Sequence, residues 1–248
     1  MQKLRLRYAK RGRLRFTSHR DIARAFERAL RRAHVPMALS QGFNPHPKIS
    51  WIGAAPTGVA SEAEYVEIQL VEVLEPAKLV AMLDEAMPPG LDVLDVAVAA
   101  GGASLADRVE ASRWLIELPG VASADLRDAV ERVLAEPVVE VERLTKHGMR
   151  TIDARAAIVS ATAREILHDE THVPDSTPAG TPCGILEVVV RQTTPAVRPD
   201  DVLSALRVVA ALEPPVPAKA TRMAQGRLDD SGGLADPLAP DREIHPAG

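Results

Sequence analysis

Hydrophobic and polar residues alternate along the start of the chain. Residues 4–8 place an apolar side chain at every second position with a basic side chain between, the period of a strand with one exposed face. A turn is expected at residues 10–13, where glycine interrupts a basic run. Leu14 and Phe16 then continue the alternation, so the sequence predicts that the strand resumes after this turn.

A helix is expected next. Ser18, with Asp21 three residues later, resembles a capping box, which satisfies free N–H groups at the start of a helix. An apolar stripe at helical spacing follows: Ile22, Ala23, Phe26, Leu30 and Ala33. Four arginines at positions i, i+4, i+8 and i+11 line another face of this helix: Arg20, Arg24, Arg28 and Arg31.

The pattern continues as two strands, a helix and a last strand. Residues 49–54 and 64–73 predict the two strands. Pro76 opens the helix, the Pro-Pro-Gly run at 88–90 ends it, and residues 91–99 predict the last strand. The order β-α-β-β-α-β is that of a ferredoxin-like unit.

A similar order recurs after a glycine-rich linker at residues 101–104. Both halves contain a helix opened by proline, a Pro-Pro pair that ends it and a following strand. Residues 156–168 fit either a strand or a helix, and residues 169–184 indicate a polar loop. The further elements expected are strands at 112–118, 138–144, 149–152, 185–192 and 216–223, a helix capped by Ser123 and a helix opened by Pro199.

We therefore expect an α/β (α+β) protein built from two ferredoxin-like lobes. The lobes are predicted at residues 1–100 and 111–223. Residues 224–248 are rich in Gly, Pro and Asp and show little periodicity, so we expect them to form a disordered tail.

Charge is segregated along the chain. The first 50 residues carry 13 Lys and Arg against two acidic residues, whereas the other 198 carry 17 against 32, so the net charge of −4 hides a basic N-terminal lobe. A local positive field attracts polyanions even when the whole molecule is acidic. The alternative is a basic face that pairs with the acidic lobe or with a protein partner.

The cysteine content and the hydropathy of the chain limit which cellular compartment and which cofactors are expected. The single cysteine, Cys183, excludes a disulfide framework and an iron–sulfur cluster held by this chain alone, which needs several thiolates. No apolar run approaches the roughly 20 residues that span a bilayer, and the N-terminal residues do not resemble a signal peptide. We expect a cytoplasmic protein without a cofactor.

Residues 40–50 are chemically richer than a plain connection. The prolines at 45 and 47 hold Asn44 and His46 extended, and Gly42 permits a turn that other residues resist. The segment is either a polar binding loop or a rigid connector whose polar groups satisfy its own backbone. On the binding interpretation, one pocket would be shared by His19, Arg20, Gln41, Asn44, His46 and Lys48.

Several segments carry a resemblance to a known family. They are RLRFTSHRD at 13–21, AFERALRRA at 25–33, SQGFNPHPKIS at 40–50 and PTGVASEAEY at 56–65. In these segments the chain resembles the uncharacterised radical-SAM-linked (radical-SAM-associated) domain family, specifically over residues 2–100 and more loosely to about residue 223.

The resemblance implies a context for the protein. In that family the domain occurs alone or fused behind a B12-binding radical-SAM enzyme, and it is associated with ribonuclease E/G-type proteins. The three clustered cysteines of a radical-SAM enzyme are missing here, so the chain is not itself the radical enzyme. We expect a non-catalytic accessory of RNA processing or modification, with RNA such as tRNA or rRNA and a radical-SAM enzyme or ribonuclease as partners.

An RNA-binding protein is the first of three functional hypotheses. Planar guanidinium groups bind phosphates bidentately, and the loop would read a nucleotide or an RNA fold. Aromatic residues for base stacking are few in this lobe, namely Tyr8, Phe16, Phe43 and Trp51. The predicted RNA-binding residues are Arg13, Arg15, Arg20, Arg24, Arg28, Arg31, Gln41, Asn44, His46 and Lys48.

The alternatives are an enzyme and a scaffold. A metal-independent RNA endonuclease would use His19 and His46 as acid and base. A scaffold would dock its basic helix on an acidic protein without binding RNA. A metal site is not expected, because no metal-binding spacing is found among the residues of suitable type: His19, Asp21, His46, Glu62 and Glu64.

Overall fold

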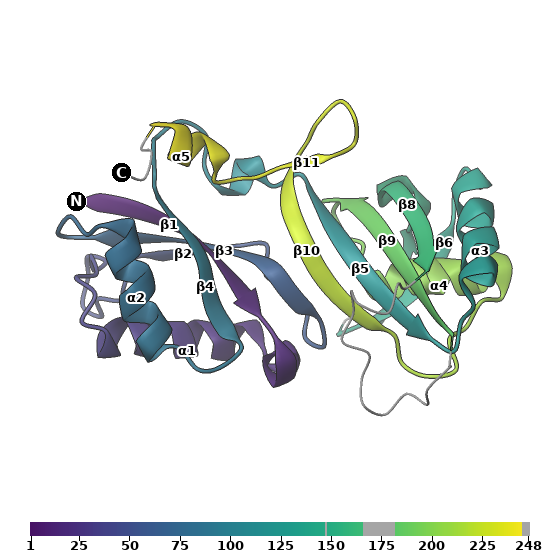
Figure 1. The fold of residues 1–248 in the computed structure, drawn as a ribbon, viewed down its shortest axis with the longest axis horizontal. Helices are drawn as coiled ribbons and strands as arrows, with labels where there is room; N and C mark the ends of the chain where they lie inside the picture. The colour runs from purple at the N-terminus through teal and green to yellow at the C-terminus, as the bar shows by residue number, and fades with distance from the viewer. Residues whose placement is uncertain (147, 166–181, 245–248) are drawn as a thin grey trace. The chain divides into compact units, whose positions relative to one another are not determined.

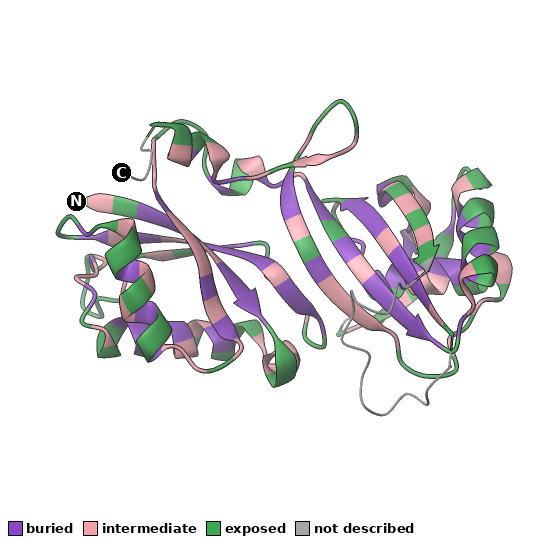
Figure 2. Cartoon of the chain, viewed as in Figure 1, coloured by how far each residue is buried: buried purple, intermediate pink, exposed green. Residues whose placement is uncertain are grey.

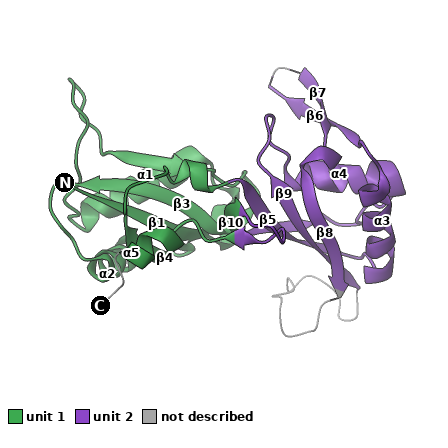
Figure 3. Ribbon diagram, turned by 90° about the horizontal axis from the view of Figure 1, so that it is seen from above, with its two compact units in different colours: residues 1–109, 224–227, 235–248 green, residues 110–223, 228–234 purple. Residues whose placement is uncertain are grey.

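The computed structural model describes residues 1–146, 148–165 and 182–244 of the chain (Figure 1). The chain forms two compact units (Figure 3). None of the helices in the described residues is long and apolar enough to cross a membrane. Unit 1 comprises Met1–Val109, Ala224–Arg227 and Ala235–Gly248, and unit 2 comprises Glu110–Met223 and Leu228–Leu234.

Unit 1 is a ferredoxin-like β-α-β-β-α-β unit, as the sequence predicts. Its elements are β1 (Gln2–Lys10), α1 (His19–Arg32), β2 (Ile49–Ile52), β3 (Ala60–Leu70), α2 (Pro76–Ala86) and β4 (Leu91–Val98). The strand order is β4-β1-β3-β2, and each neighbouring pair is antiparallel. Both helices pack on the same face of this sheet (Figure 1).

The two faces of this sheet have different environments. Leu4, Leu6 and Tyr8 of β1 are buried against Phe26 of α1 and Leu83 of α2, which forms the main core of the unit. Figure 2 shows in purple where buried positions fall along the chain. The intervening β1 residues Arg5 and Arg7 lie on the opposite face, because successive side chains of a strand alternate. The register pairs Arg5 with Glu67 and Arg7 with Tyr65 of β3, which places these four residues on the same face.

The C-terminal segment corrects one expectation. Residues 224–244 are not a disordered tail: they include the end of β10 (Lys219–Leu228), β11 (Leu234–Ala235) and α5 (Ala239–Ile244). Within this segment Leu238 and Asp241 are fully buried. Composition did not reveal this order because the contacts that create it are with residues more than 100 positions away. Residues 245–248 lie outside the described residues.

The segment after β1 also differs from the prediction. The strand does not resume at Leu14, because residues Gly12–Phe16 form a 3₁₀ helix, η1. Gly12 adopts a positive φ of 55°, and the N–H of Leu14 donates to the carbonyl of Arg11 at 3.1 Å. Leu14 still packs against the core, while Phe16 is exposed.

Unit 2 repeats the arrangement with an insertion. Its elements are β5 (Ala111–Pro119), α3 (Ser123–Ala135), β6 (Glu140–Thr145), β7 (Gly148–Asp153), β8 (Ile158–Glu165), β9 (Cys183–Arg191), α4 (Pro199–Ala210) and the start of β10. The strand order β10-β5-β9-β8 matches that of unit 1, and the inserted strands β6 and β7 form a separate two-stranded sheet.

The segment at 156–168, whose pattern fits either a strand or a helix, is described as far as residue 165. Residues 158–165 form a strand, not a helix. Most of the predicted polar loop at 169–184 lies outside the described residues. Ser123 is the first residue of α3 and makes no cap, because the N-cap position is taken by Ala122.

Candidate nucleic-acid interface

The start of α1 is fixed by Ser18. Its hydroxyl accepts a hydrogen bond from the N–H of Asp21 at 3.2 Å and donates to the Asp21 carboxylate at 2.7 Å. This side-chain cap satisfies one of the free N–H groups of the first turn, as the near capping box predicts. The cap holds the helix that carries the predicted arginine face.

The arginine face of α1 is exposed. Ile22, Phe26 and Leu30 point into the core of unit 1, and the arginines lie on the remaining surface of the helix. Arg24 has one weak ion pair, with Asp21 at 3.5 Å. Within the described part of the chain, no ion pair is made by the other exposed arginines of the helix: Arg20, Arg28, Arg31 and Arg32.

The two predicted arginines before the helix differ. Arg13 is exposed in η1, whereas Arg15 is half-buried and places its guanidinium 4.6 Å from the ring centroid of Phe16. This cation–π contact orients an exposed aromatic ring beside a cation. Both groups precede the first turn of α1.

The loop after α1 has a hydrogen-bonded base and an exposed tip. The N–H of Ser40 donates to the carbonyl of His46 at 2.9 Å, and the His46 N–H donates to the Ser40 hydroxyl at 3.1 Å. The His46 Nδ1 atom lies 3.0 Å from the same hydroxyl. Gly42 has a φ of 126°, which a side chain would strain, and next to it Phe43 is fully exposed. The loop therefore presents an apolar ring on a fixed base.

His46 and Lys48 line an open pocket of about 340 Å³. Lys3 of β1 and Gln69 of β3 line it as well, next to Glu67, which binds the Lys3 ammonium at 3.1 Å. Lys3 and Gln69 were not predicted as site residues, because their proximity to the loop follows only from the β1–β3 register, in which they are partners.

This pocket does not contain the other residues expected to share it. The side chains of His19, Arg20, Gln41 and Asn44 do not line it. Trp51, the neighbour of His19, pairs with Val66, whereas the Lys48 carbonyl accepts from the N–H of Gln69. These two positions on β3 are about 10 Å apart at a strand rise of about 3.3 Å per residue. Of the six residues predicted to share a pocket, this one is lined by His46 and Lys48.

His19 belongs to an aromatic cluster. Its ring lies edge-on to Trp51 with centroids 5.3 Å apart, and Trp51 in turn contacts Phe26 at 5.4 Å and Tyr8 at 6.1 Å. Tyr8 is buried and Trp51 is half-buried, so these rings hold α1 on the sheet. Of the four aromatic residues considered for base stacking, Phe16 and Phe43 are the exposed ones.

The residues considered for metal binding are dispersed. Among the described residues no group of three or more His, Cys, Asp or Glu side chains could hold a metal ion. Glu62 binds Arg11, Glu64 accepts from the N–H of Ala55 at 3.1 Å, and Asp21 contacts the Ser18 cap. These carboxylates are thus used in structural contacts.

Comparisons with known proteins give a family and a distant structural likeness. A family model described as "Uncharacterized protein conserved in bacteria (DUF2344)" matches residues 3–199. The search of curated proteins found no match. Among solved structures, the first two RRM domains of the yeast poly(U)-binding protein Pub1 align with 89% of this chain and 98% of that chain, at 10% identity and a TM-score of 0.20.

Proposed function

The chain belongs to this family of proteins conserved in bacteria, and we propose that unit 1 binds RNA through the arginine face of α1 and the loop at residues 40–48. Phosphates are bound by the arginines, and the loop contacts a nucleotide through Gln41, Asn44, His46 and Lys48. The protein itself is non-catalytic in this proposal, and it acts in the cytoplasm.

The observation that carries the proposal is the exposure of unpaired arginines on one helix. If this face were neutralised by acidic residues of the same chain, ion pairs would be expected along it. Within the described residues the face has one such pair, between Arg24 and Asp21. Guanidinium groups displayed in this way suit phosphate oxygens, which they bind through two parallel hydrogen bonds.

The partner enzyme is proposed from the resemblance to the radical-SAM-linked domain family. A chain with Cys183 as its single cysteine needs another protein to supply radical-SAM chemistry. We therefore propose that the protein presents tRNA or rRNA to a radical-SAM enzyme or to a ribonuclease E/G-type protein. Copurification of RNA and one such enzyme with the tagged full chain from its own cells is the expected result.

Charge reversal on α1 tests RNA binding directly. Changing Arg24, Arg28 and Arg31 to Glu should weaken binding and flatten its dependence on salt. Each lost contact to a single-stranded phosphate should lower the log–log salt slope by about 0.7, because fewer counterions are released. Electrophoretic mobility or fluorescence anisotropy at several salt concentrations measures both quantities.

A matched control separates a specific surface from net charge. Three of the exposed arginines of unit 2 serve as the control, and their change to Glu alters the net charge equally: Arg127, Arg191 and Arg207. This control should leave affinity and salt slope close to those of the unchanged protein. Equal loss in both triple variants, or no RNA binding by the unchanged protein at low salt, would contradict the proposal. If the protein binds no RNA but retains a protein partner through the α1 arginines, the scaffold hypothesis is favoured.

A further inference from the structure

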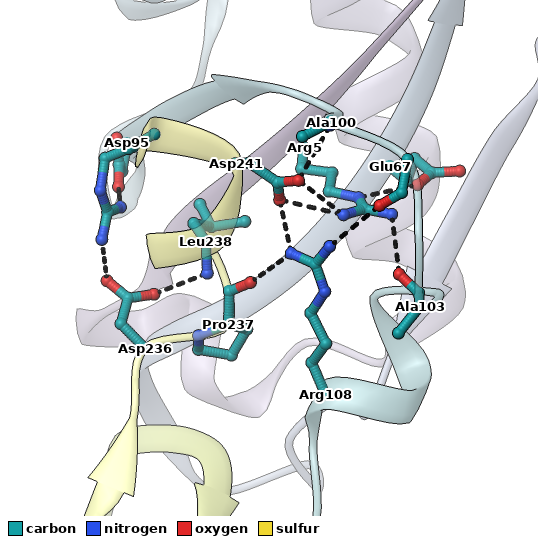
Figure 4. Close-up of polar contacts among 12 residues, drawn as sticks. Arg5, Glu67, Asp95, Ala100, Ala103, Arg108, Asp236, Pro237, Leu238 and Asp241 are labelled. Atoms are coloured by element: carbon teal, nitrogen blue, oxygen red, sulfur yellow. Dashed lines mark hydrogen bonds and ion pairs between the residues drawn. The ribbon is translucent and has the colours of Figure 1, made fainter. Parts of the chain in front are cut away.

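The C-terminal strap, residues 235–244, lies on the face of the unit 1 sheet opposite α1 and α2. Leu238 of the strap is fully buried in a small apolar cluster with Ile52, Tyr65 and Leu105. Figure 4 shows α5 of the strap above the strand that carries Arg5, with Asp241 pointing down to it. The strap thus covers the centre of a sheet face that has no helix of the β-α-β-β-α-β unit on it.

Asp241 fills a site made of basic groups (Figure 4). The Arg5 Nη1 atom donates to both carboxylate oxygens, at 2.8 and 3.0 Å, and Arg108 Nη1 donates to one of them at 2.8 Å. The N–H of Ala100 donates to the carboxylate at 3.0 Å. Two guanidinium groups and a backbone N–H are also the donors with which proteins bind a phosphate. The carboxylate therefore occupies an anion site in which a phosphate would meet the same donors.

Two further residues on this face of the sheet have the chemistry of a nucleic-acid surface. Arg7 lies two positions from Arg5 on the same face, and its Nε atom is buried without a hydrogen-bond partner in the described residues. Tyr65 is its cross-strand partner on the central strand β3 and is buried in the cluster around Leu238. Single-strand binders with a four-stranded sheet of this type stack bases on aromatic side chains of the sheet.

We propose that the strap is a removable cover over a second RNA-binding surface of unit 1. When it is displaced, Tyr65 stacks on an unpaired base, and Arg5, Arg7 and Arg108 bind the flanking phosphates. The inference rests on the proposed function and deepens it, because it assigns single-stranded RNA as the ligand of this surface.

The attachment of the strap suits a cover that can leave. Its ten residues carry three acidic side chains and one basic side chain, so it is an acidic segment held on arginines. Its helix has six residues, which is too short to be stable alone. Arg5 keeps a partner when Asp241 leaves, since its Nε donates to Glu67 at 3.0 Å. The Nη1 atom of Arg5 then becomes available to a phosphate, while its Nη2 atom still donates to the carbonyl of Ala103 at 3.3 Å.

The test compares the full chain with a chain that ends at Ala235. A single-stranded RNA oligonucleotide and the matching duplex serve as probes, and binding is measured by fluorescence anisotropy. The shortened protein should bind the single strand at least tenfold more tightly than the full chain does, with a much smaller change for the duplex. Tyr65→Leu in the shortened protein should remove most of this gain.

A peptide of residues 235–248 provides a second measurement. Added to the shortened protein, it should compete with the single strand, whereas the same peptide with Leu238→Ala and Asp241→Asn should not. Unchanged affinity in a folded shortened protein would overturn the proposal. Failure of the shortened protein to fold, judged by circular dichroism and thermal unfolding, would also overturn it, because the strap would then be a structural element.

The α1 charge-reversal background separates the two proposals. In a chain with Arg24, Arg28 and Arg31 changed to Glu, shortening should raise the affinity for the single strand by about the same factor as it does in the unchanged background. If charge reversal abolishes binding in the full chain and shortening has no effect in either background, the proposed function holds and the cover is refuted. If shortening gives Tyr65-dependent binding while charge reversal has no effect, the cover holds and the α1 face is refuted.

Discussion

The imidazole of His19 meets the indole of Trp51 edge to face, with ring centroids 5.3 Å apart and ring planes at 82°. The contact joins the first residue of α1 to β2, and Phe26 extends the cluster into the core. His19 thereby has a packing role that the sequence could not distinguish from a catalytic one.

This contact predicts that His19→Ala lowers stability. Aromatic pairs contribute about 0.5–1.5 kcal/mol beyond their burial, so a loss of about 1 kcal/mol in the free energy of unfolding is expected. Urea denaturation measures it, and His19→Phe should recover part of the loss. RNA affinity should change little. An RNA cleavage activity that His19→Ala removes without loss of stability would instead support the endonuclease hypothesis.

The Ser18 cap predicts a second stability effect. Ser18→Ala removes the acceptor for the N–H of Asp21 and should cost about 1 kcal/mol, while Ser18→Asp should retain most of the stability. Thermal unfolding of the three proteins measures the difference. The arginine face lies on α1 and is intact whenever this helix is folded. RNA binding by Ser18→Ala should therefore be normal under conditions where the variant is fully folded. A loss of binding at full folding would mean that Ser18 contacts RNA itself.

The buried aspartates predict pH effects of opposite sign. Burial acts to raise the pKa of Asp241, but hydrogen bonds from Ala100, Arg5 and Arg108 outweigh it, and the pKa lies below its ordinary value. A depressed pKa contributes stability above the unfolded value, about 3.9 for Asp, and this contribution is lost as pH falls through the folded value. Asp241→Asn should therefore lower stability at neutral pH, and its difference from the unchanged protein should shrink below about pH 4.

Asp201 in unit 2 is the matched comparison. Burial raises the pKa of Asp201 despite its contacts with Arg198 and Arg143. The folded protein then binds the proton more readily than the unfolded chain does, so this group favours folding more as pH falls. Urea unfolding at several pH values should show the contributions of Asp241 and Asp201 changing in opposite directions. Parallel pH dependence in the two Asn variants would contradict these shifts.

Local patterns were sufficient to predict most of the fold. Alternation along residues 4–8, the apolar stripe of α1 and the proline that opens α2 each specify an element within a few residues. The repeated order gave the duplicated ferredoxin-like architecture. The strap was missed because Asp241 is ordered by Arg5, 236 positions earlier, and no local pattern records such a contact.

The candidate site was predicted less completely. The exposure of the α1 arginines follows from helical periodicity, which places them away from the buried stripe. The placement of His19 against Trp51 and of His46 beside Lys3 does not, because it depends on which part of β3 each segment adjoins. The same register brings Lys3 into the pocket, although nothing in its sequence neighbourhood indicates a site.

Phe43 gives the sharpest test of the loop. Its ring is fully exposed, so Phe43→Ala should leave the free energy of unfolding unchanged within about 0.5 kcal/mol. A ring held outward next to Gly42 suits stacking on an unpaired base, which is worth about 1–3 kcal/mol. The variant should therefore bind single-stranded RNA roughly 5- to 150-fold more weakly, with an unchanged salt slope, because no phosphate contact is lost.

Phe16→Ala is the control for exposed aromatic area at the other end of α1. A loss of affinity confined to Phe43→Ala would assign base contact to the loop, and equal losses would indicate a surface that extends along the helix. A changed salt slope in Phe43→Ala would mean that the ring acts by positioning a cation. Normal affinity in both variants would refute base stacking by the loop, because Phe43 is the large apolar side chain that its tip presents to solvent, and would leave phosphate contacts and the polar groups of the loop as the source of binding.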